Sequence, residues 1–171
     1  YGPSCTLSGI EQEASELGYT ILLQLIRKPE TNDVEQLLQE MLSRYVDGII
    51  WAVPEIAGKP AWLNDFPFNQ AVSIVFLSMG PQPDQFIVAV DNYGGGLSVT
   101  RHLIAQGCQN IGLITGPLDW WEARQRKLGW REALESVGLP AEESLITEGN
   151  WSASSGEQGL AVLLARHPNL D

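Results

Sequence analysis

VDNYGGGLSVTRHL, residues 90–103, joins the end of an apolar strand to the start of a helix through an acid and three glycines. Glycine-rich junctions of this kind hold nucleotide phosphates in dinucleotide-binding folds, where the pattern is GxGxxG. The match is incomplete, because Gly94 and Gly96 fill two of the glycine positions and Val99 stands at the third. The next strand ends in ITGP and lacks the acid that would bind a ribose. We therefore interpret the glycines as a tight turn at positive φ, with Asp91 at the mouth of a cleft or as a helix N-cap.

The composition indicates a globular chain that does not itself bind nucleic acid. With 171 residues, 44% of them hydrophobic and 18% charged, the chain can bury a substantial core. Its 10 basic and 21 acidic residues give a formal net charge of -11. A surface of that charge repels phosphate backbones, so we expect no direct contact between this segment and nucleic acid.

The cysteines and the ends of the chain give information on the cellular compartment of the protein. Cys5 and Cys108 are far apart and lack CxxC spacing, which favours free thiols and hence a cytoplasmic protein. No stretch approaches the ~18 apolar residues of a membrane span, and the N-terminus does not resemble a signal peptide. The chain opens on a predicted helix with no strand before it and stops at HPNLD, where another strand is expected, so we expect a fragment.

Predicted helices and strands alternate along the chain. Apolar residues at helical spacing predict a helix over residues 4–17 that ends at Gly18, and Asn32 and Glu35 have capping-box spacing in a second helix over residues 31–45. The runs predicted as strands are apolar throughout, which suits burial on both faces of a parallel sheet. Predicted strands cover residues 19–26, 46–54, 71–78, 86–91, 110–116 and 144–149, and further helices cover about 95–106, 122–137 and 154–165. This order predicts a doubly wound α/β fold.

The sequence contains no constellation typical of catalysis or metal binding. His102 falls inside a predicted helix and His167 in a terminal loop, and neither has a second ligand at metal-site spacing. No GxSxG pattern occurs, and the serines of WSASSG are better suited to capping a helix than to nucleophilic attack. We therefore expect no enzyme activity, no metal and no cofactor; a nucleotide-dependent enzyme would require the loop at Gly94 to hold a phosphate.

Tryptophans and arginines gather just beyond predicted strand ends. The segments DWWEAR and EGNWS both follow strands directly, and ligands of open α/β sheets bind outside the carboxyl ends of the strands. An aromatic plate, an arginine fork and nearby carboxylates are the chemistry that a sugar site needs, although large aromatic residues are commonly part of the core.

Six segments together also resemble a known family. They are GIEQEASELGYTILL, VDGIIWAVPE, VDNYGGGLSVTRHLIAQG, NIGLITGP, ARQRKLGWREALESVGLP and EGNWSASSG. Their order and spacing are similar to those of the effector-binding domain of bacterial transcription regulators of the lac repressor and galactose repressor family. The resemblance implies a type I periplasmic-binding-protein-like fold of two doubly wound parallel-sheet lobes. Residues 1–90 would form the N-terminal lobe and residues 91–171 an incomplete C-terminal lobe.

The resemblance also implies a ligand site. It places Arg124 where the family's arginine binds ligand hydroxyls or carboxylates, and Trp151 where an aromatic ring stacks on the sugar. Ser78 stands where many members carry an aspartate that holds sugar hydroxyls. The alternatives are a helix-surface role for Arg124, a core role for Trp151 and N-cap roles for Ser4 and Asp91. The expected ligand-binding residues are Pro3 and Ser4 in a cleft-lining loop, Ser78, Asp91 at the lobe crossover, Arg124 and Trp151.

On this basis we expect the ligand-sensing domain of a bacterial transcription regulator. A small molecule, expected to be a sugar or a sugar derivative, would act through a homodimer on operator-binding headpieces that this chain lacks. The alternative is a periplasmic sugar-binding protein of a transporter, which shares the fold. A headpiece upstream of the domain would indicate the regulator, and a signal peptide would indicate the transporter.

Overall fold

The computed structural model describes residues 2–26, 34–55 and 72–171, which fall into two compact units, Tyr1–Asn32 and Asp33–Asp171. In the first unit, α1 spans Gly2–Glu16. Gly18 follows with a φ of 80°, and the amide of Tyr19 donates to the carbonyl of Ala14. This left-handed glycine ends the helix, which confirms the helix predicted over residues 4–17.

The strand predicted over residues 19–26 is wrong, because the structure assigns these residues to neither a helix nor a strand. Leu22, Leu23 and Leu25 are all exposed. A β-strand exists only where a neighbouring strand supplies hydrogen-bond partners, and no strand of the described residues pairs with this run. The capping box predicted at Asn32 lies outside the described residues.

The second unit begins with α2, Val34–Ser43, followed by a parallel sheet in the order β1-β2-β3. The strands are β1, Gly48–Trp51, β2, Ser73–Leu77, and β3, Phe86–Val88. Parallel pairing confirms the predicted sheet type, but burial on both faces is wrong for this sheet. Ile74 and Phe76 are buried, whereas Ile50 is 50% and Val88 62% exposed. Only one face of β2 is fully packed.

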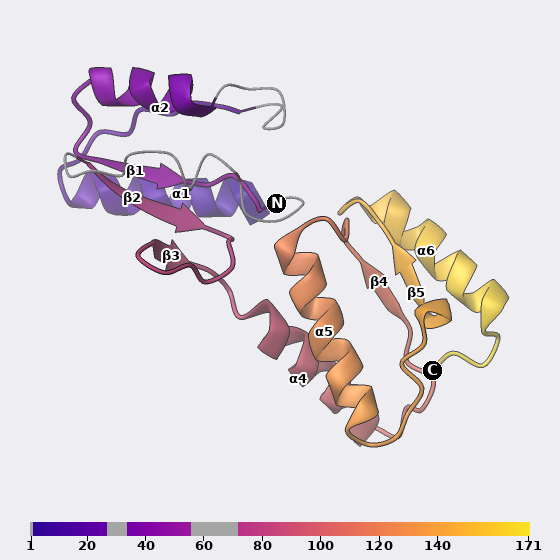
Figure 1. Ribbon diagram of the computed structural model, residues 1–171. Coiled ribbons are helices and arrows are strands. Elements are labelled where there is room, and N and C mark those ends of the chain that lie inside the picture. Colours follow the sequence, from indigo (N-terminus) through magenta and orange to yellow (C-terminus); the bar gives the residue numbers. More distant parts are fainter. Residues whose placement is uncertain (1, 27–33, 56–71) are drawn as a thin grey trace. The chain divides into compact units, whose positions relative to one another are not determined.

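A second parallel sheet pairs β4, Leu113–Thr115, with β5, Ile146–Glu148, which the short 3-10 turn Glu143–Leu145 precedes. In Figure 1, α4, Asn92–Ala105, and α5, Trp121–Glu135, lie on one face of this sheet, and α6, Ala153–Arg166, lies on the other. The core between α5 and the sheet contains Ile111, Trp130, Leu134, Leu145 and Ile146. The layers and the parallel pairing confirm the α/β fold class. Among the described residues, no helix combines the length and the hydrophobicity needed to cross a membrane.

The three glycines of residues 94–96 do not form the predicted positive-φ turn. They lie inside the first turns of α4, and none of them has a positive φ. A Cβ on Gly96 would lie within 3.0 Å of the Arg126 backbone. A Cβ on Gly129 would likewise lie within 3.0 Å of the carbonyl oxygen of Tyr93. Glycine is therefore required at residues 96 and 129, where α4 and α5 approach each other closely, whereas a Cβ on Gly95 would meet no atom within 4 Å.

Candidate functional site

The loops that follow β4 and β5 are tied together at the carboxyl ends of both strands. The amide of Leu118 donates to Glu148 Oε1 at 3.0 Å. The amide of Gly149 donates to the carbonyl of Thr115 at 2.9 Å. These bonds hold the two loops beside each other, at the edge where ligands of parallel sheets bind.

The loop after β5 presents Trp151 in an unusual backbone conformation. Ser152 is the N-cap of α6 and accepts from the amide of Ser155 at 3.2 Å, which confirms that a serine of WSASSG caps a helix. Asn150 Oδ1 accepts from the amide of Ser152 at 3.1 Å. Between them Trp151 has a φ of 66°, a left-handed value that costs a non-glycine residue free energy. Trp151 is 47% exposed, so it is not part of the core.

Two side chains from α5 and its N-cap stand against the Trp151 ring. The guanidinium carbon of Arg126 lies over the ring at 5.5 Å from its centroid, within the range of a cation–π interaction. The Trp120 ring makes an edge contact, with centroids 5.8 Å apart and planes at 63°. Arg126 Nε also donates to Asn92 Oδ1 at 2.7 Å, which ties the arginine to the start of α4. An aromatic ring bordered by guanidinium donors can bind a ligand that has both C–H and hydroxyl groups.

Arg124 has a different environment from the one expected for the ligand-binding arginine. Its Nη1 donates to the carbonyls of Asp119 at 2.6 Å and Leu118 at 3.3 Å. Its Nη2 pairs with Glu55 Oε1 at 3.3 Å. The guanidinium therefore already has three protein acceptors, and in the described part of the chain the arginine over Trp151 is Arg126.

Glu55 connects the segment after β1 to α5, and sequence reasoning missed it. The side chain is only 8% exposed. Its Oε2 accepts from the amide of Gly80 at 3.0 Å, and its backbone carbonyl accepts from the amide of Trp121 at 3.0 Å. With Arg124 on Oε1, both carboxylate oxygens have partners. A single acid after an apolar run, as in WAVPE, was the only sequence signal for this buried carboxylate.

The other expected ligand residues are dispersed. Pro3 and Ser4 lie in the first turn of α1, so the expected cleft-lining loop is wrong because these residues are helical; Ser4 is exposed. Ser78 follows β2 with a φ of 57°, and its amide donates to the carbonyl of Val88 at 3.2 Å. Asp91 is the N-cap of α4, and its Oδ1 accepts from the amide of Gly94 at 2.8 Å.

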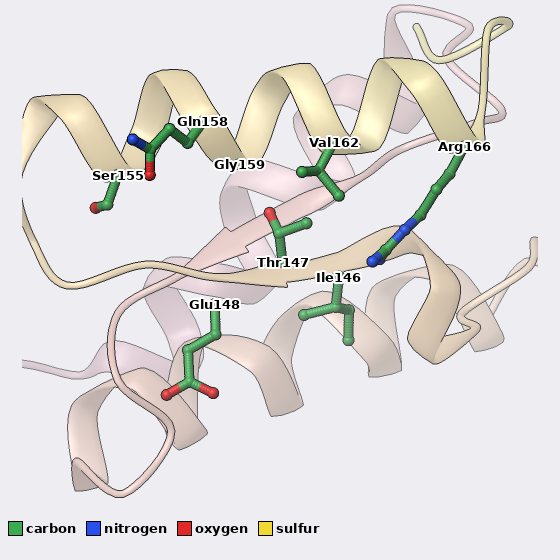
Figure 2. Close-up of a pocket in the computed structure, with 8 residues that line it drawn as sticks. All are labelled: Ile146, Thr147, Glu148, Ser155, Gln158, Gly159, Val162 and Arg166. Carbon is green, nitrogen blue, oxygen red and sulfur yellow. The ribbon is translucent and has the colours of Figure 1, made fainter.

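The cavities of the second unit include one beside β4 and one beside β5. One, of about 420 Å³, brings Asp91 and Arg126 to the same lining, with Val90, Asn92, Gly95, Gly96, Val99, Thr100, Leu113 and Trp130. The other, of about 380 Å³, lies between β5 and α6 and contains none of the expected ligand residues (Figure 2). Its lining residues are Ile146, Thr147, Glu148, Ser155, Gln158, Gly159, Val162 and Arg166. Of these two cavities, the one that adjoins Arg126 is lined by one expected ligand residue, Asp91, and neither cavity is lined by Trp151 or Arg124.

Unsatisfied polar atoms also occur near the two loops. Thr115, 7% exposed, ends β4 directly before the loop, and its Oγ1 has no hydrogen-bond partner in the described residues. Glu122 Oε2, in the first turn of α5, is likewise buried without one. Buried polar atoms without partners are uncommon away from sites that receive water or a ligand. The described residues contain no group of three or more histidine, cysteine or acidic side chains that could hold a metal, and both cysteines are free.

Comparison with known proteins gives a consistent result. A family model described as "Periplasmic binding proteins and sugar binding domain of LacI family" matches residues 5–171. The chain is 28% identical to the lactose operon repressor of Klebsiella pneumoniae over 171 residues, covering 99% of this chain and 47% of that protein. It is 32% identical to the HTH-type transcriptional regulator DegA of Bacillus subtilis (strain 168) over 162 residues, covering 92% and 47%.

Solved structures agree with the sequence relatives. A structure described as a complex of the transcriptional regulator CelR with cellobiose superposes with a TM-score of 0.76 at 28% identity. The match covers 95% of this chain and 49% of that one. The chain spans about half the length of the curated relatives that it matches.

Proposed function

Because this chain belongs to the family of periplasmic binding proteins and LacI-type sugar-binding domains, we propose that it is the ligand-sensing domain of a bacterial transcription regulator. The ligand is a sugar or a sugar derivative, and no bond is made or broken. Operator DNA is bound by a headpiece outside this chain, the regulator is a homodimer, and it acts in the cytoplasm. Support comes from the relatives, which are transcription regulators, and from the CelR structure, whose description names cellobiose.

The observation that carries the sugar assignment is the placement of Trp151. The residue is 47% exposed and lies beyond a strand end, on a backbone with a φ of 66°. Strained residues persist where the surrounding structure holds them, and they cluster at functional sites. An exposed aromatic face of this kind stacks against the C–H face of a sugar ring.

We infer that Arg126 provides the hydroxyl-binding fork at this site. Its guanidinium lies 5.5 Å from the centroid of the Trp151 ring, and it lines the same cavity as Asp91. Among the described residues, the Arg126 side chain donates through Nε to Asn92 Oδ1, which leaves its terminal nitrogens for a ligand. Arg124 stays a candidate for ligand binding, as do Pro3, Ser4, Ser78 and Asp91, and the variants below separate the two arginines.

The proposed mechanism is linkage between two sites. A sugar that binds one arrangement of the domain more tightly shifts the population towards that arrangement. Coupling of this kind is typically about 1–3 kcal/mol, and it would reach the headpieces through the homodimer. The transporter alternative is not favoured, because the relatives reported above are transcription regulators.

The test is a sugar-binding experiment on matched variants. The full chain is screened by thermal shift against a panel of monosaccharides, disaccharides including cellobiose, and sugar phosphates, because a bound ligand raises the melting temperature. The affinity for the best hit is then measured by calorimetry. We expect Trp151→Ala and Arg126→Ala each to weaken binding by about tenfold or more, which corresponds to about 1.4 kcal/mol.

Two control variants match the chemistry of these changes away from the site. Leu160→Ala removes an apolar side chain of similar exposure, 46%, from α6. Arg101→Ala removes one positive charge from the exposed surface of α4. Both controls should bind like the unmodified chain. A panel without any stabilising sugar would contradict the sugar assignment, and equal losses in the controls would contradict the assignment of the site.

A further inference from the structure

Gly116, the first residue after β4, lies directly against the Trp151 ring. A Cβ built on Gly116 would meet Cζ2, Cε2 and Cη2 of Trp151, all closer than 3.0 Å, a distance that real Cβ atoms essentially never show. These are three consecutive atoms of the six-membered ring, and the three distances are nearly equal. If the Cβ approached the ring in its own plane, it would lie close to one ring atom and clearly farther from the two atoms bonded to it. The Cβ would therefore enter through the face of the ring.

The backbone of Gly116 thus covers one face of the tryptophan. The three nearest atoms to the built Cβ all belong to Trp151, so the ring is what excludes a side chain at this position. Gly116 is also not among the glycines with a positive φ, and its backbone conformation alone does not require glycine. The reason for glycine here is the close approach of the ring.

Two further features restrict the same ring. The φ of 66° at Trp151 fixes the direction in which its side chain leaves the backbone. Trp120 contacts the ring at 63° between the two planes. A ring that is backed by a peptide on one face and bordered by a second indole has at most one face left for a ligand. The Arg126 guanidinium, 5.5 Å from the ring centroid, lies over the same ring and would share that space with the ligand.

We propose that Gly116 is a positioning residue that holds Trp151 as a one-faced stacking plate. This inference rests on the proposed sugar-binding function for the ligand, but the positioning itself is a property of the unliganded chain. A one-faced plate binds a single flat apolar surface, such as the C–H face of one pyranose ring, and does not sandwich a ligand between two indoles. A side chain at residue 116 displaces the plate.

The test is a double-mutant cycle on stability that needs no ligand. The full chain is compared with Gly116→Ala, Trp151→Ala and the double variant by urea denaturation. We expect Gly116→Ala to lower the urea midpoint clearly in the unmodified chain. In the Trp151→Ala background the added methyl group has room, so at least half of that loss should disappear. Gly156→Ala, whose Cβ meets no atom within 4 Å, is the matched glycine control and should be neutral or stabilising.

A second measurement reports on the ring itself. Close indole pairs give an exciton couplet in circular dichroism, and Trp120→Phe identifies the part of the signal that belongs to the Trp120–Trp151 pair. Gly116→Ala should reduce that part, whereas Gly156→Ala should leave it unchanged. If Gly116→Ala does not fold but the double variant does, the coupling is demonstrated in its strongest form.

The proposal is overturned if Gly116→Ala costs the same in both backgrounds, if both variants fail to fold, or if the couplet is unchanged. None of these outcomes involves a sugar. If the double-mutant cycle shows coupling between Gly116 and Trp151 but no sugar stabilises the chain, the positioning role of Gly116 is retained and the proposed function of the site is contradicted.

Discussion

The two sides of the α5 N-terminus differ in how their side chains are partnered. On one side, Arg124 has three protein acceptors, and Glu55 is 8% exposed with both carboxylate oxygens bound. On the other side, Trp151 is 47% exposed on a strained backbone, and Arg126 lies over its ring. Only two positions along one helix separate the two arginines.

This difference indicates which of the two arginines stabilises the fold and which is available to a ligand. A buried carboxylate needs compensation, so Arg124 contributes to stability. An exposed aromatic ring in a left-handed conformation gains little stability from its position, so its placement suggests binding. Mutation of Arg124 is therefore expected to affect mainly the free energy of unfolding, and mutation of Arg126 mainly the affinity for a ligand.

The largest expected effect is on the Glu55 side. Arg124→Ala leaves a buried carboxylate without its cation and should lower the free energy of unfolding by about 2 kcal/mol; full burial would cost more, but Arg124 is 35% exposed. Arg126→Ala loses the Asn92 hydrogen bond and the cation–π contact with Trp151 and should cost less, about 1 kcal/mol. Urea denaturation at neutral pH measures both. If Arg126→Ala proved the more destabilising, the division of roles between the two arginines would be wrong.

A smaller effect is expected at Asp91, which combines a helix cap with a place in the cavity that Arg126 lines. Asp91→Ala removes the acceptor for the Gly94 amide and should cost about 1 kcal/mol, whereas Asp91→Asn keeps a capping oxygen and should cost little. Chemical denaturation measures the cap. Sugar affinity of the asparagine variant then tests the ligand role by itself, because an unchanged affinity would assign Asp91 to the cap alone.

The smallest effect is expected at an exposed ion-pair cluster between α5 and the 3-10 turn Glu143–Leu145. Glu143 is 67% exposed and pairs with Lys127 and Arg131, whose hydrogen bonds lower the pKa of its carboxyl. Because the pKa of Glu143 is lower in the folded state, its ion pairs stabilise the fold above the ordinary pKa of about 4.5. This stabilisation is lost as the pH falls through the folded-state pKa.

Glu143→Gln should therefore cost at most about 0.5 kcal/mol at neutral pH, and the difference should shrink below pH 4.5. Thermal unfolding of both chains across this range measures the difference. A cost as large as that of Arg124→Ala would show that burial does not distinguish the two ion pairs.

Sequence reasoning succeeded where the relevant forces act over a few neighbouring residues. The helix predicted over residues 4–17 and its Gly18 cap depend on local spacing, and so does the serine cap of α6. The prediction failed for residues 19–26, because a strand depends on a partner strand, and that partner is often distant in the chain. It also failed for the role of Gly96, because a need for close helix packing and a need for positive φ select the same residue.

The candidate site divides in the same way. Strand ends followed by tryptophan and arginine already indicated where a ligand would bind, since parallel strands bring their carboxyl ends to one edge. Arg124 and Arg126 could not be separated on that basis. Two residues along a helix amount to about 200° of rotation, and only the positions of Glu55 and Trp151 show what each arginine meets.

By itself, then, the sequence determined the alternation of helices and strands and the parallel sheets, because periodicity and capping are local, and it predicted a region for the candidate site. The tertiary structure decided that Arg126 lies over Trp151, that Glu55 is buried against Arg124, and that Gly116 covers one face of the indole. Each of these is a contact between residues far apart in the chain. Such contacts depend on the packing of α5 and of the loops after β4 and β5, and no short stretch of sequence encodes them.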